Sequence, residues 1–358
     1  SSLFDVIRNR DIMLHYPYQS FQYIVDLLRE ASIDPNVRSI KMTFYRAAIN
    51  SSVMNALINA ARNGKSVTVF LELQARFDEE ANIYWAELLQ KNGVKILPTI
   101  PGLKVHSKLI LIRRKENQHN VYYANISTGN FNESTAKVYA DDSLLTANQT
   151  IANDVYKVFQ LFESRYFIPK FKELIVSPFT MRDFFIGKIN REIRNVKAGK
   201  EAWMIIKLNS LVDKKITRKL YEASRAGVKI KIIVRGICVL IPGIEGVSEN
   251  IEAFSIVDKF LEHSRVYVFN NDGNNEYYIT SADWMQRNFD HRIEVATPVY
   301  DPKIREELWT MLQIQLKDNT KARIISEDNV NRYRETGSGK RVRSQFEIYD
   351  YFRNQLEG

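Results

Sequence analysis

Cysteine and long apolar runs are scarce in this chain of 358 residues, and each scarcity excludes a class of protein. The single cysteine, Cys238, cannot form an internal disulfide, so nothing in the composition points to secretion. No apolar stretch approaches the ~20 residues of a membrane-spanning helix, and the N-terminus lacks a signal-peptide pattern. We therefore expect a cytoplasmic protein without a transmembrane segment, while peripheral association with a membrane stays open.

Common motifs for metals and nucleotides are missing as well. The sequence contains no CxxC, no HExxH and no GxxxxGK[ST] loop. The neighbouring acids Asp141 and Asp142 are able to support magnesium, although such pairs are common at exposed turns. These motifs therefore identify no cofactor.

Positive charge, by contrast, is in excess. The formal net charge of +9 and the isoelectric point of about 9.3 favour a polyanionic partner such as nucleic acid, an anionic membrane or a phosphate polymer. Many soluble proteins are mildly basic without such a partner, so charge alone does not decide. The length suits two ordinary domains, and a first residue of Ser instead of Met is consistent with a fragment of a longer protein.

The hydrophobic pattern repeats one order of helices and strands in both halves. In each half a helical stripe precedes a strand, a second helix ends at a glycine (Gly64 or Gly227), and a buried strand follows. We predict an α/β protein with mixed sheets, in which the domains 1–173 and 174–358 are related by internal duplication. The charged stretch from about Glu327 is expected to be peripheral to the chemistry.

Two of the five histidines lie in duplicated surroundings. His106 precedes Lys108, and His263 precedes Arg265, with one serine between each pair. Each cluster leads into a strand-like stretch and then a small polar turn, Ser-Thr-Gly-Asn in the first half and Thr-Ser-Ala-Asp in the second. A single His beside a Lys is most often a surface accident, but two copies with matching turns favour a site.

This duplicated pattern suits chemistry at a phosphorus atom. One imidazole attacks while the other faces it, and the cations hold the anionic oxygens. We therefore expect the two halves to bring His106, His263, Lys108 and Arg265 to one phosphoryl group.

Arginines follow the predicted strands at equivalent places. Arg46 and Arg76 do so in the first half, and Arg235 does so in the second. Side chains at the carboxyl ends of strands line the crevice of an α/β sheet, and guanidinium groups bind paired phosphate oxygens. For each arginine taken alone, a surface residue that ends a strand is an equally good interpretation, but their placement at equivalent strand ends argues against coincidence.

Three further residues adjoin the expected crevice. Asn130 follows Gly129, whose bare backbone lets a ligand approach closely, and Asn209 follows the predicted strand 203–208. Tyr139 lies just beyond the first polar turn. We expect Asn130 and Asn209 to contact phosphate and Tyr139 to contact a base or phosphate, although an ordinary turn and a structural tyrosine explain the same residues.

The two His-x-cation clusters with their turns resemble the phospholipase D superfamily. The motif of that family has an Asp five residues after the Lys, where this chain has Arg113 and Asn270. Arg265 also replaces the second Lys of the motif. These departures argue against a plain phosphodiesterase or nuclease, which stays the first alternative.

A closer resemblance covers nearly the whole chain. It is to the bacterial polyphosphate kinases of the class with phospholipase-D-like catalytic domains, and it corresponds to their C-terminal part. The strings that carry it are IMLHYPY from residue 12, FYR from 44, QARFDEEAN from 74, GLKVHSK from 102, STGNFN from 127, LNSLVD from 208, VRGIC from 234, FLEHSR from 260 and SADWM from 281.

The resemblance implies two tandem phospholipase-D-like domains and reversible transfer of the γ-phosphate of ATP to polyphosphate. It implies that His106 is phosphorylated, that His263 faces it, and that Tyr139 and Arg235 contact the nucleotide. The carboxylate that orients His106 has two candidates, Asp142 and Glu294, between which the sequence does not choose.

Cofactor and partners follow from the same resemblance. Arg46 and Arg76 correspond to the magnesium–phosphate site of the family, where a cationic arginine binds phosphate oxygens beside Mg²⁺ and not the ion itself. The expected partners are ATP, ADP and inorganic polyphosphate, not nucleic acid, and the full-length protein is expected to be a homo-oligomer. A non-catalytic fragment that binds polyanions is the second alternative.

Overall fold

The chain divides into two compact units. The computed structural model describes residues 2–72, 79–164, 168–328, 330–335 and 339–357. Unit 1 comprises Ser1–Val176 and His291–Thr297, and unit 2 comprises Ser177–Asp290 and Pro298–Gly358. A short segment from the second half of the sequence thus belongs to the first unit. The boundary between residues 173 and 174 stays a prediction for the domains.

Unit 1 is built on a mixed sheet. In spatial order its strands are β1 (Ile12–Tyr16), β8 (Tyr139–Thr146), β7 (His119–Ser127), β6 (Lys108–Glu116), β2 (Val37–Phe44), β3 (Ser66–Leu71) and β4 (Lys95–Leu97). β2, β3 and β4 run parallel, whereas β6, β7, β8 and β1 are joined by antiparallel pairings. The parallel strands follow from the helices that connect them, because a parallel pair needs a long crossover.

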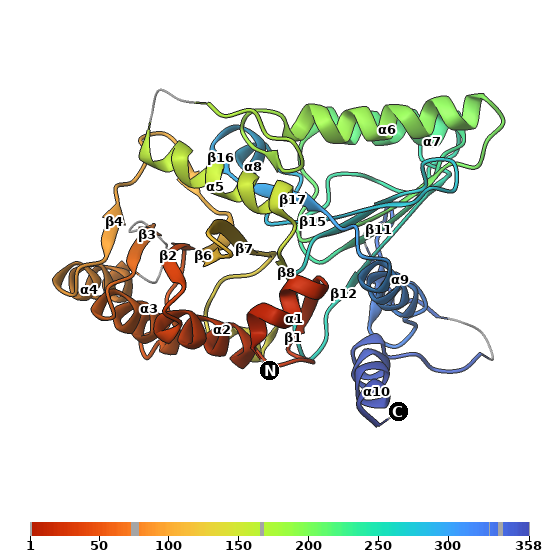
Figure 1. The fold of residues 1–358 in the computed structure, drawn as a ribbon. Helices are drawn as coiled ribbons and strands as arrows, with labels where there is room; N and C mark the ends of the chain where they lie inside the picture. Colours follow the sequence, from red (N-terminus) through yellow and green to blue (C-terminus); the bar gives the residue numbers. More distant parts are fainter. Residues whose placement is uncertain (1, 73–78, 165–167, 329, 336–338, 358) are drawn as a thin grey trace. The chain divides into compact units, whose positions relative to one another are not determined.

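Helices cover both faces of this sheet. α2 (Gln22–Ile33), α3 (Ser52–Arg62) and α4 (Glu79–Lys91) lie on one side, and α5 (Gln149–Glu163) lies on the other (Figure 1). Alternation along the strands decides which helix each side chain meets. Ile40 and Met42 of β2 share a core with α2 and α3, whereas the ring of Phe70 in β3 lies 5.2 Å from that of Phe162 in α5.

Unit 2 repeats the same plan. Its strands in spatial order are β18 (Ala322–Ile324), β12 (Ile251–Ile256), β11 (Lys229–Val234), β10 (Trp203–Leu208), β14 (Val266–Phe269) and β15 (Glu276–Thr280). β10, β11 and β12 are parallel, and β14 pairs antiparallel with β10 and β15. In each unit, the strand that carries or follows the cation of the His-x-cation cluster pairs antiparallel with the first parallel strand: β6 with β2 in unit 1, and β14 with β10 in unit 2. The predicted duplication and mixed sheets are confirmed.

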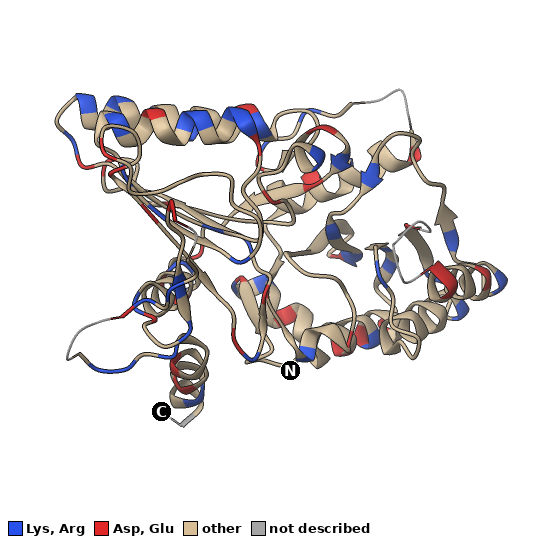
Figure 2. Ribbon diagram, turned by 180° about the vertical axis from the view of Figure 1, so that it is seen from behind, with Lys and Arg blue, Asp and Glu red and all other residues tan. Residues whose placement is uncertain are grey.

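Local signals in the sequence account for the helix between β10 and β11. α7 (Lys214–Ala226) begins after Asp213, whose carboxylate accepts the N–H of Ile216 at 3.0 Å. It ends at Gly227, whose φ of 105° is the left-handed conformation that glycine adopts without strain. α7 packs against α6 (Met181–Lys197), along which Lys and Arg recur (Figure 2).

Two helices lie in the C-terminal part of the chain. α9 (Pro302–Leu316) begins after Asp301, whose side chain accepts the N–H groups of Lys303 and Ile304, and α10 (Ser344–Glu357) follows near the end of the chain. That the stretch from about Glu327 is peripheral to the chemistry stays a prediction, but Gln345 of α10 bonds to Phe260 and Glu262, which precede His263 in the chain. The charged composition of this stretch did not predict the contact, because a single residue, Gln345 in the first turn of α10, makes it.

Short elements complete the two units. They are α1 (Leu3–Asn9), β5 (Lys104–Val105), η1 (Thr135–Lys137), β9 (Ile175–Val176), β13 (Leu261–Glu262), α8 (Gln286–Asp290), β16 (Arg292–Ile293) and β17 (Val295–Pro298). No helix in the described part of the chain is both long enough and apolar enough to span a membrane.

Candidate active site

A two-residue parallel pairing brings a distant part of the sequence to His106. Within unit 1, β16 runs beside β5, and the carbonyl of Ile293 accepts the N–H groups of His106 and Ser107, each at 3.0 Å. The backbone around His106 is thereby tied to the segment that carries Glu294. Neither strand is long enough to be read from hydrophobic alternation.

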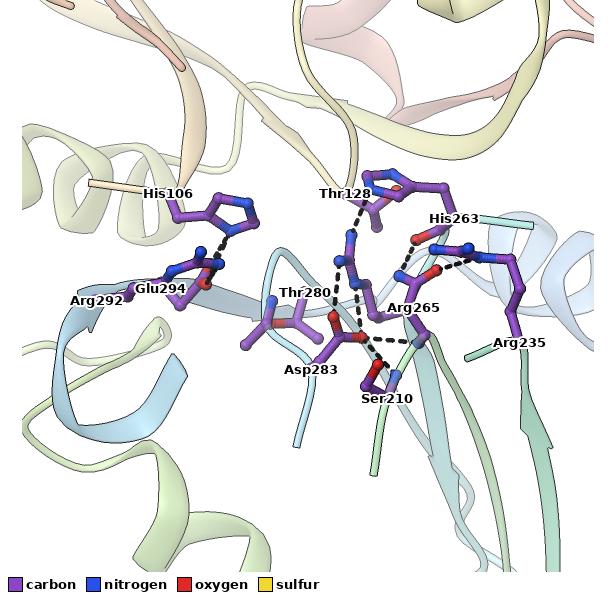
Figure 3. A network of polar contacts seen from close by, with 12 residues as sticks. His106, Thr128, Ser210, Arg235, His263, Arg265, Thr280, Asp283, Arg292 and Glu294 are labelled. Atoms are coloured by element: carbon purple, nitrogen blue, oxygen red, sulfur yellow. Dashed lines mark hydrogen bonds and ion pairs between the residues drawn. The ribbon is translucent and has the colours of Figure 1, made fainter. Parts of the chain in front are cut away.

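Glu294 fixes the imidazole of His106. The Nδ1 atom of His106 lies 2.8 Å from Oε1 and 3.0 Å from Oε2 of Glu294 (Figure 3). The Glu294 side chain is 0% exposed and that of His106 is 12% exposed. A carboxylate at Nδ1 holds the hydrogen on that nitrogen, which puts the lone pair of the neutral ring on Nε2. The other candidate carboxylate, Asp142, lies instead 2.6 Å from Nδ1 of His15.

The ring of Tyr45 lies next to His106, Lys108 and Arg46. Its ring centroid lies 5.0 Å from that of His106, nearly perpendicular at 83°. The Nζ of Lys108 lies 5.7 Å and the Cζ of Arg46 lies 5.9 Å from the same ring. Lys108 is buried and donates to the carbonyl oxygen of His106. The sequence placed Arg46 and Lys108 near one site but assigned Tyr45 no role.

The Ser-Thr-Gly-Asn turn packs tightly against β8. Thr128 donates to Oδ1 of Asp141 at 2.7 Å, and a Cβ on Gly129 would lie 2.0 Å from Oδ2 of that carboxylate. The Oδ1 of Asn130 is buried without a hydrogen-bond partner among the described residues, which fits a residue that meets a ligand. Tyr139, half-buried, is the first residue of β8.

The residues predicted to lie near magnesium are Arg46, Arg76, Asp141 and Asp142. Arg76 lies outside the described residues, whereas Arg46 lies just beyond β2, as predicted. Within the part of the chain that the structure describes, no three His, Cys, Asp or Glu side chains gather into a group able to hold a metal ion. Asp141 and Asp142 are engaged by Thr128 and His15.

In unit 2, the cation beside the histidine is locked in place. Arg265 donates from Nη2 to Oδ2 of Asp283 at 3.0 Å and from Nε to Oδ1 at 3.2 Å (Figure 3). The same carboxylate accepts the backbone N–H of Asn209 at 2.7 Å and that of Ser210 at 3.3 Å. Arg265 Nη1 lies 3.4 Å from Nε2 of His263. The guanidinium is therefore fixed next to the imidazole.

The charge of Asp283 depends on this contact. Burial raises its pKa, but the positive charge and hydrogen bonds of Arg265, with the N–H of Asn209, outweigh burial and lower the pKa to about 2. Asp283 is thus ionised at neutral pH and keeps Arg265 paired. The sequence identified Asp283 only as part of the second polar turn.

Asn209 and Arg235 follow β10 and β11, as predicted, and their side chains contact each other there. Asn209 donates from Nδ2 to the carbonyl of His263 at 3.0 Å. Arg235 donates from Nε to Oδ1 of Asn209 and to the carbonyl of Glu262, each at 2.9 Å. Both residues therefore hold the backbone of the His263 cluster. The structure groups His106 with Lys108 and Arg46 in unit 1, and the predicted convergence of the two clusters stays a prediction.

Sequence comparisons match both units to one family. The profile of "Polyphosphate kinase C-terminal domain 1" matches residues 2–167, and that of "Polyphosphate kinase C-terminal domain 2" matches residues 174–345. The chain is 53% identical over 354 residues to a polyphosphate kinase of Vibrio vulnificus and 50% identical over 351 residues to that of Escherichia coli K12. These alignments cover 99% and 98% of the chain but 51% of each relative, so the chain spans about half of their length.

A comparison with solved structures points to the same family. The chain superposes on a polyphosphate kinase from Porphyromonas gingivalis with a TM-score of 0.93 and 44% identity, covering 99% of this chain and 55% of that one. A phosphatidylserine synthase from Haemophilus influenzae shares the fold alone, with a TM-score of 0.61 and 11% identity over 97% of this chain and 94% of that one.

Proposed function

Because the chain belongs to the polyphosphate kinase family, we propose that it transfers the γ-phosphate of ATP reversibly to inorganic polyphosphate, with His106 as the phosphate carrier. The observation that carries this proposal is the contact of the buried Glu294 with Nδ1 of His106. That contact directs the lone pair of the ring to Nε2, the atom that must attack phosphorus. We propose a cytoplasmic, homo-oligomeric setting for the full-length protein.

Two displacements at phosphorus account for the reaction. In the first, a bond forms between Nε2 of His106 and the γ-phosphorus while the bond from phosphorus to the bridging oxygen breaks, and ADP leaves. In the second, a terminal oxygen of polyphosphate attacks the phosphorus and the N–P bond breaks, which restores neutral His106. Lys108 and Arg46 stabilise the charge on the equatorial oxygens. Each step is reversible, so ADP and polyphosphate regenerate ATP.

The second cluster supplies fixed positive charge in this scheme. We propose that His263 and Arg265 bind the transferred phosphoryl group or the adjoining phosphates. Asn209 and Arg235, with Tyr139 and Asn130 of unit 1, are proposed contacts to nucleotide or phosphate. Arg265 suits this role because its fork geometry is held by Asp283 before any ligand arrives.

Magnesium enters this proposal only with the nucleotide. The carboxylates beside the two clusters already bond to His106, Arg265, Thr128 or His15, so the donor set described here does not fit a protein-held ion. We propose that Mg²⁺ arrives as its complex with ATP, and that Arg46 and Arg76 bind phosphate oxygens of that complex.

Labelling with ATP that carries radioactive phosphorus at the γ position tests the proposal. The wild-type protein should acquire acid-labile, alkali-stable phosphate and lengthen polyphosphate, and His106→Ala should abolish both while ATP binding persists. His119→Gln is the matched control, because His119 is an exposed histidine at the start of β7 in the same unit. Undiminished labelling in His106→Ala would rule the carrier role out.

The same assay separates the alternatives. A phospholipase-D-type phosphodiesterase or nuclease would cleave phosphodiesters and take no phosphate from ATP. A polyanion-binding fragment would bind polyphosphate without labelling. One observation weighs against the former: Asn270, which replaces the motif Asp, serves a turn by accepting the N–H of Gly273 at 3.0 Å.

A further inference from the structure

The residue before His263 is a buried carboxylate with three side-chain donors. Oε2 of Glu262 accepts from Nζ of Lys207 at 2.8 Å and from Nε2 of Gln315 at 3.1 Å. Oε1 accepts from Nε2 of Gln345 at 3.0 Å. Glu262 is 4% exposed and Gln345 is 0% exposed. Both carboxylate oxygens are thus satisfied by protein groups, as a buried charge requires.

Lys207 bonds to the residues on both sides of His263, Glu262 and Ser264. Its Nζ also donates to Oγ of Ser264 at 2.8 Å, so one ammonium joins the residues on either side of His263. Arg265 then follows directly in the chain. Lys207 therefore links the Glu262 carboxylate to the side chain of Ser264, the residue between His263 and Arg265.

Gln345 reaches this network from the first turn of α10. Its Oε1 accepts the N–H of Phe260 at 2.9 Å, and its Nε2 donates to the carbonyl of Phe260 at 2.8 Å as well as to Glu262. The amide therefore pairs with the backbone two residues before Glu262 and with the carboxylate itself. One side chain of a C-terminal helix thus sets the approach to the His263 cluster.

Two contacts hold α10 in place without touching Glu262. Asp318 accepts the N–H of Ser344 at 2.7 Å at the start of the helix. Arg343 donates from Nε to Asp258 at 2.9 Å. The Arg343–Asp258 pair docks the same helix on the same loop, and therefore offers a matched control for Gln345.

We propose that Gln345 is a positioning residue of the second cluster, acting through Glu262 and Lys207 on His263 and Arg265. The inference rests on the phosphoryl transfer proposed above for its catalytic readout. Removing the donor of Gln345 leaves Oε1 of a buried carboxylate unsatisfied, and a partly satisfied buried network rearranges.

Gln345→Glu is the sharpest test, because it keeps the shape and the acceptor for Phe260 N–H. The substitution replaces the donor Nε2 with a carboxylate oxygen, which repels the carboxylate of Glu262 and the carbonyl oxygen of Phe260. In the intact protein we expect kcat for phosphotransfer to fall about tenfold, as for a displaced active-site segment. Asp258→Asn, the control, keeps an acceptor for Arg343 and leaves every donor of Glu262 in place, so kcat should stay within about twofold, as expected for sites that share no partner.

Exchanging the two groups should restore part of the loss. In the double variant Glu262→Gln, Gln345→Glu, the new amide at position 262 is able to accept from Lys207 and to donate to the new carboxylate at position 345. We expect kcat to recover about threefold over the Gln345→Glu variant, since coupled partners deviate from additivity. A double variant no better than its worse single variant overturns the proposal.

The imidazole signals of His263, assigned in NMR spectra by their loss in His263→Gln, give a readout that needs no activity. They should shift in Gln345→Glu and stay in place in Asp258→Asn. Unmoved signals in Gln345→Glu, or equal shifts and equal losses of kcat in both variants, overturn the positioning role. If the wild type shows no ATP-dependent transfer, the proposed function fails, while these signals still decide the inference.

Discussion

The two His-x-cation clusters share a scaffold, but the cation of each is held by a different group: Lys108 donates to the carbonyl oxygen of His106, whereas Arg265 donates to the carboxylate of Asp283. In unit 1, Glu294 contacts the imidazole of His106. In unit 2, Asp283 contacts the guanidinium of Arg265, next to His263. A carboxylate on an imidazole fixes its tautomer, whereas a carboxylate on a guanidinium fixes a cation. We propose that unit 1 supplies the nucleophile through the oriented imidazole of His106 and that unit 2 supplies fixed positive charge through Arg265.

The first prediction tests this contrast at the nucleophile, where the largest effect is expected. Glu294→Gln leaves the shape but removes the charge that holds the hydrogen on Nδ1 of His106. We expect the rate of His106 labelling by ATP to fall by up to about ten-thousandfold, by analogy with the loss when the orienting carboxylate of a catalytic triad becomes an amide. Rapid-quench labelling measures it.

Asp142→Asn is the control for this change. Asp142 was the other candidate carboxylate, but it bonds to His15. Its labelling rate per folded molecule should stay within about tenfold of the wild type, the scale of an indirect effect. Equal losses in the two variants would contradict the assignment of Glu294.

The second prediction concerns stability in unit 2. Asp283→Asn leaves Arg265 as a buried cation without its charged partner, which should lower the free energy of unfolding by about 3 kcal/mol. Urea denaturation followed by tryptophan fluorescence measures it, because Trp284 is buried beside the substituted residue. Asp272→Asn is the control, since Asp272 pairs with Lys200 at an exposed site and should change stability by less than about 1 kcal/mol.

The third prediction gives the pH dependence of the same contact. The pKa of Asp283 is lowered from 3.8 to about 2, so its ionised form stabilises the folded state above pH ~4, and this stabilisation is lost as the pH falls from about 4 to about 2. The loss should be roughly 2 kcal/mol. Unfolding curves of the wild type should therefore approach those of Asp283→Asn over this range, and a constant difference would contradict the assignment.

The fourth prediction asks whether the two cations are interchangeable. Arg265→Lys keeps the charge but loses the two-pronged contact with Asp283, so we expect kcat to fall about tenfold. Steady-state assays of polyphosphate synthesis measure it. A variant with wild-type kcat would show that unit 2 needs only a positive charge, as unit 1 does with Lys108, and the contrast between the clusters would disappear.

Local structure was predictable from the sequence because its signals are short in range. Asp213 and Gly227 mark the ends of α7 through a side-chain cap and a positive φ, each a property of a few neighbouring residues. The strand predicted at 203–208 has those bounds as β10. The order of such elements in both halves was enough to predict the duplicated α/β fold.

The partners of the site residues were less accessible. The contact between His106 and Glu294 joins residues 188 positions apart through a two-residue strand, and the sequence offered Asp142 on equal terms. The contact between Glu262 and Gln345 spans 83 positions and depends on how α10 docks. Such contacts follow from tertiary packing, which periodicity does not encode.

The last prediction separates stability from chemistry in unit 2. Gly187 lies inside α6, and a Cβ there would meet no atom within 4 Å. Gly187→Ala should therefore raise the free energy of unfolding by about 0.5–1 kcal/mol, as alanine favours a helix interior over glycine. Asp283→Asn should also lower kcat for phosphotransfer, because it removes the charge that holds the guanidinium of Arg265 beside His263. Combined with Asp283→Asn, Gly187→Ala should recover that amount of stability in urea denaturation and leave the lowered kcat unchanged, because a Cβ at position 187 meets no atom of Arg265. Recovery of activity in the double variant would mean that Asp283 acts on the fold of unit 2 alone and not on the charge beside His263.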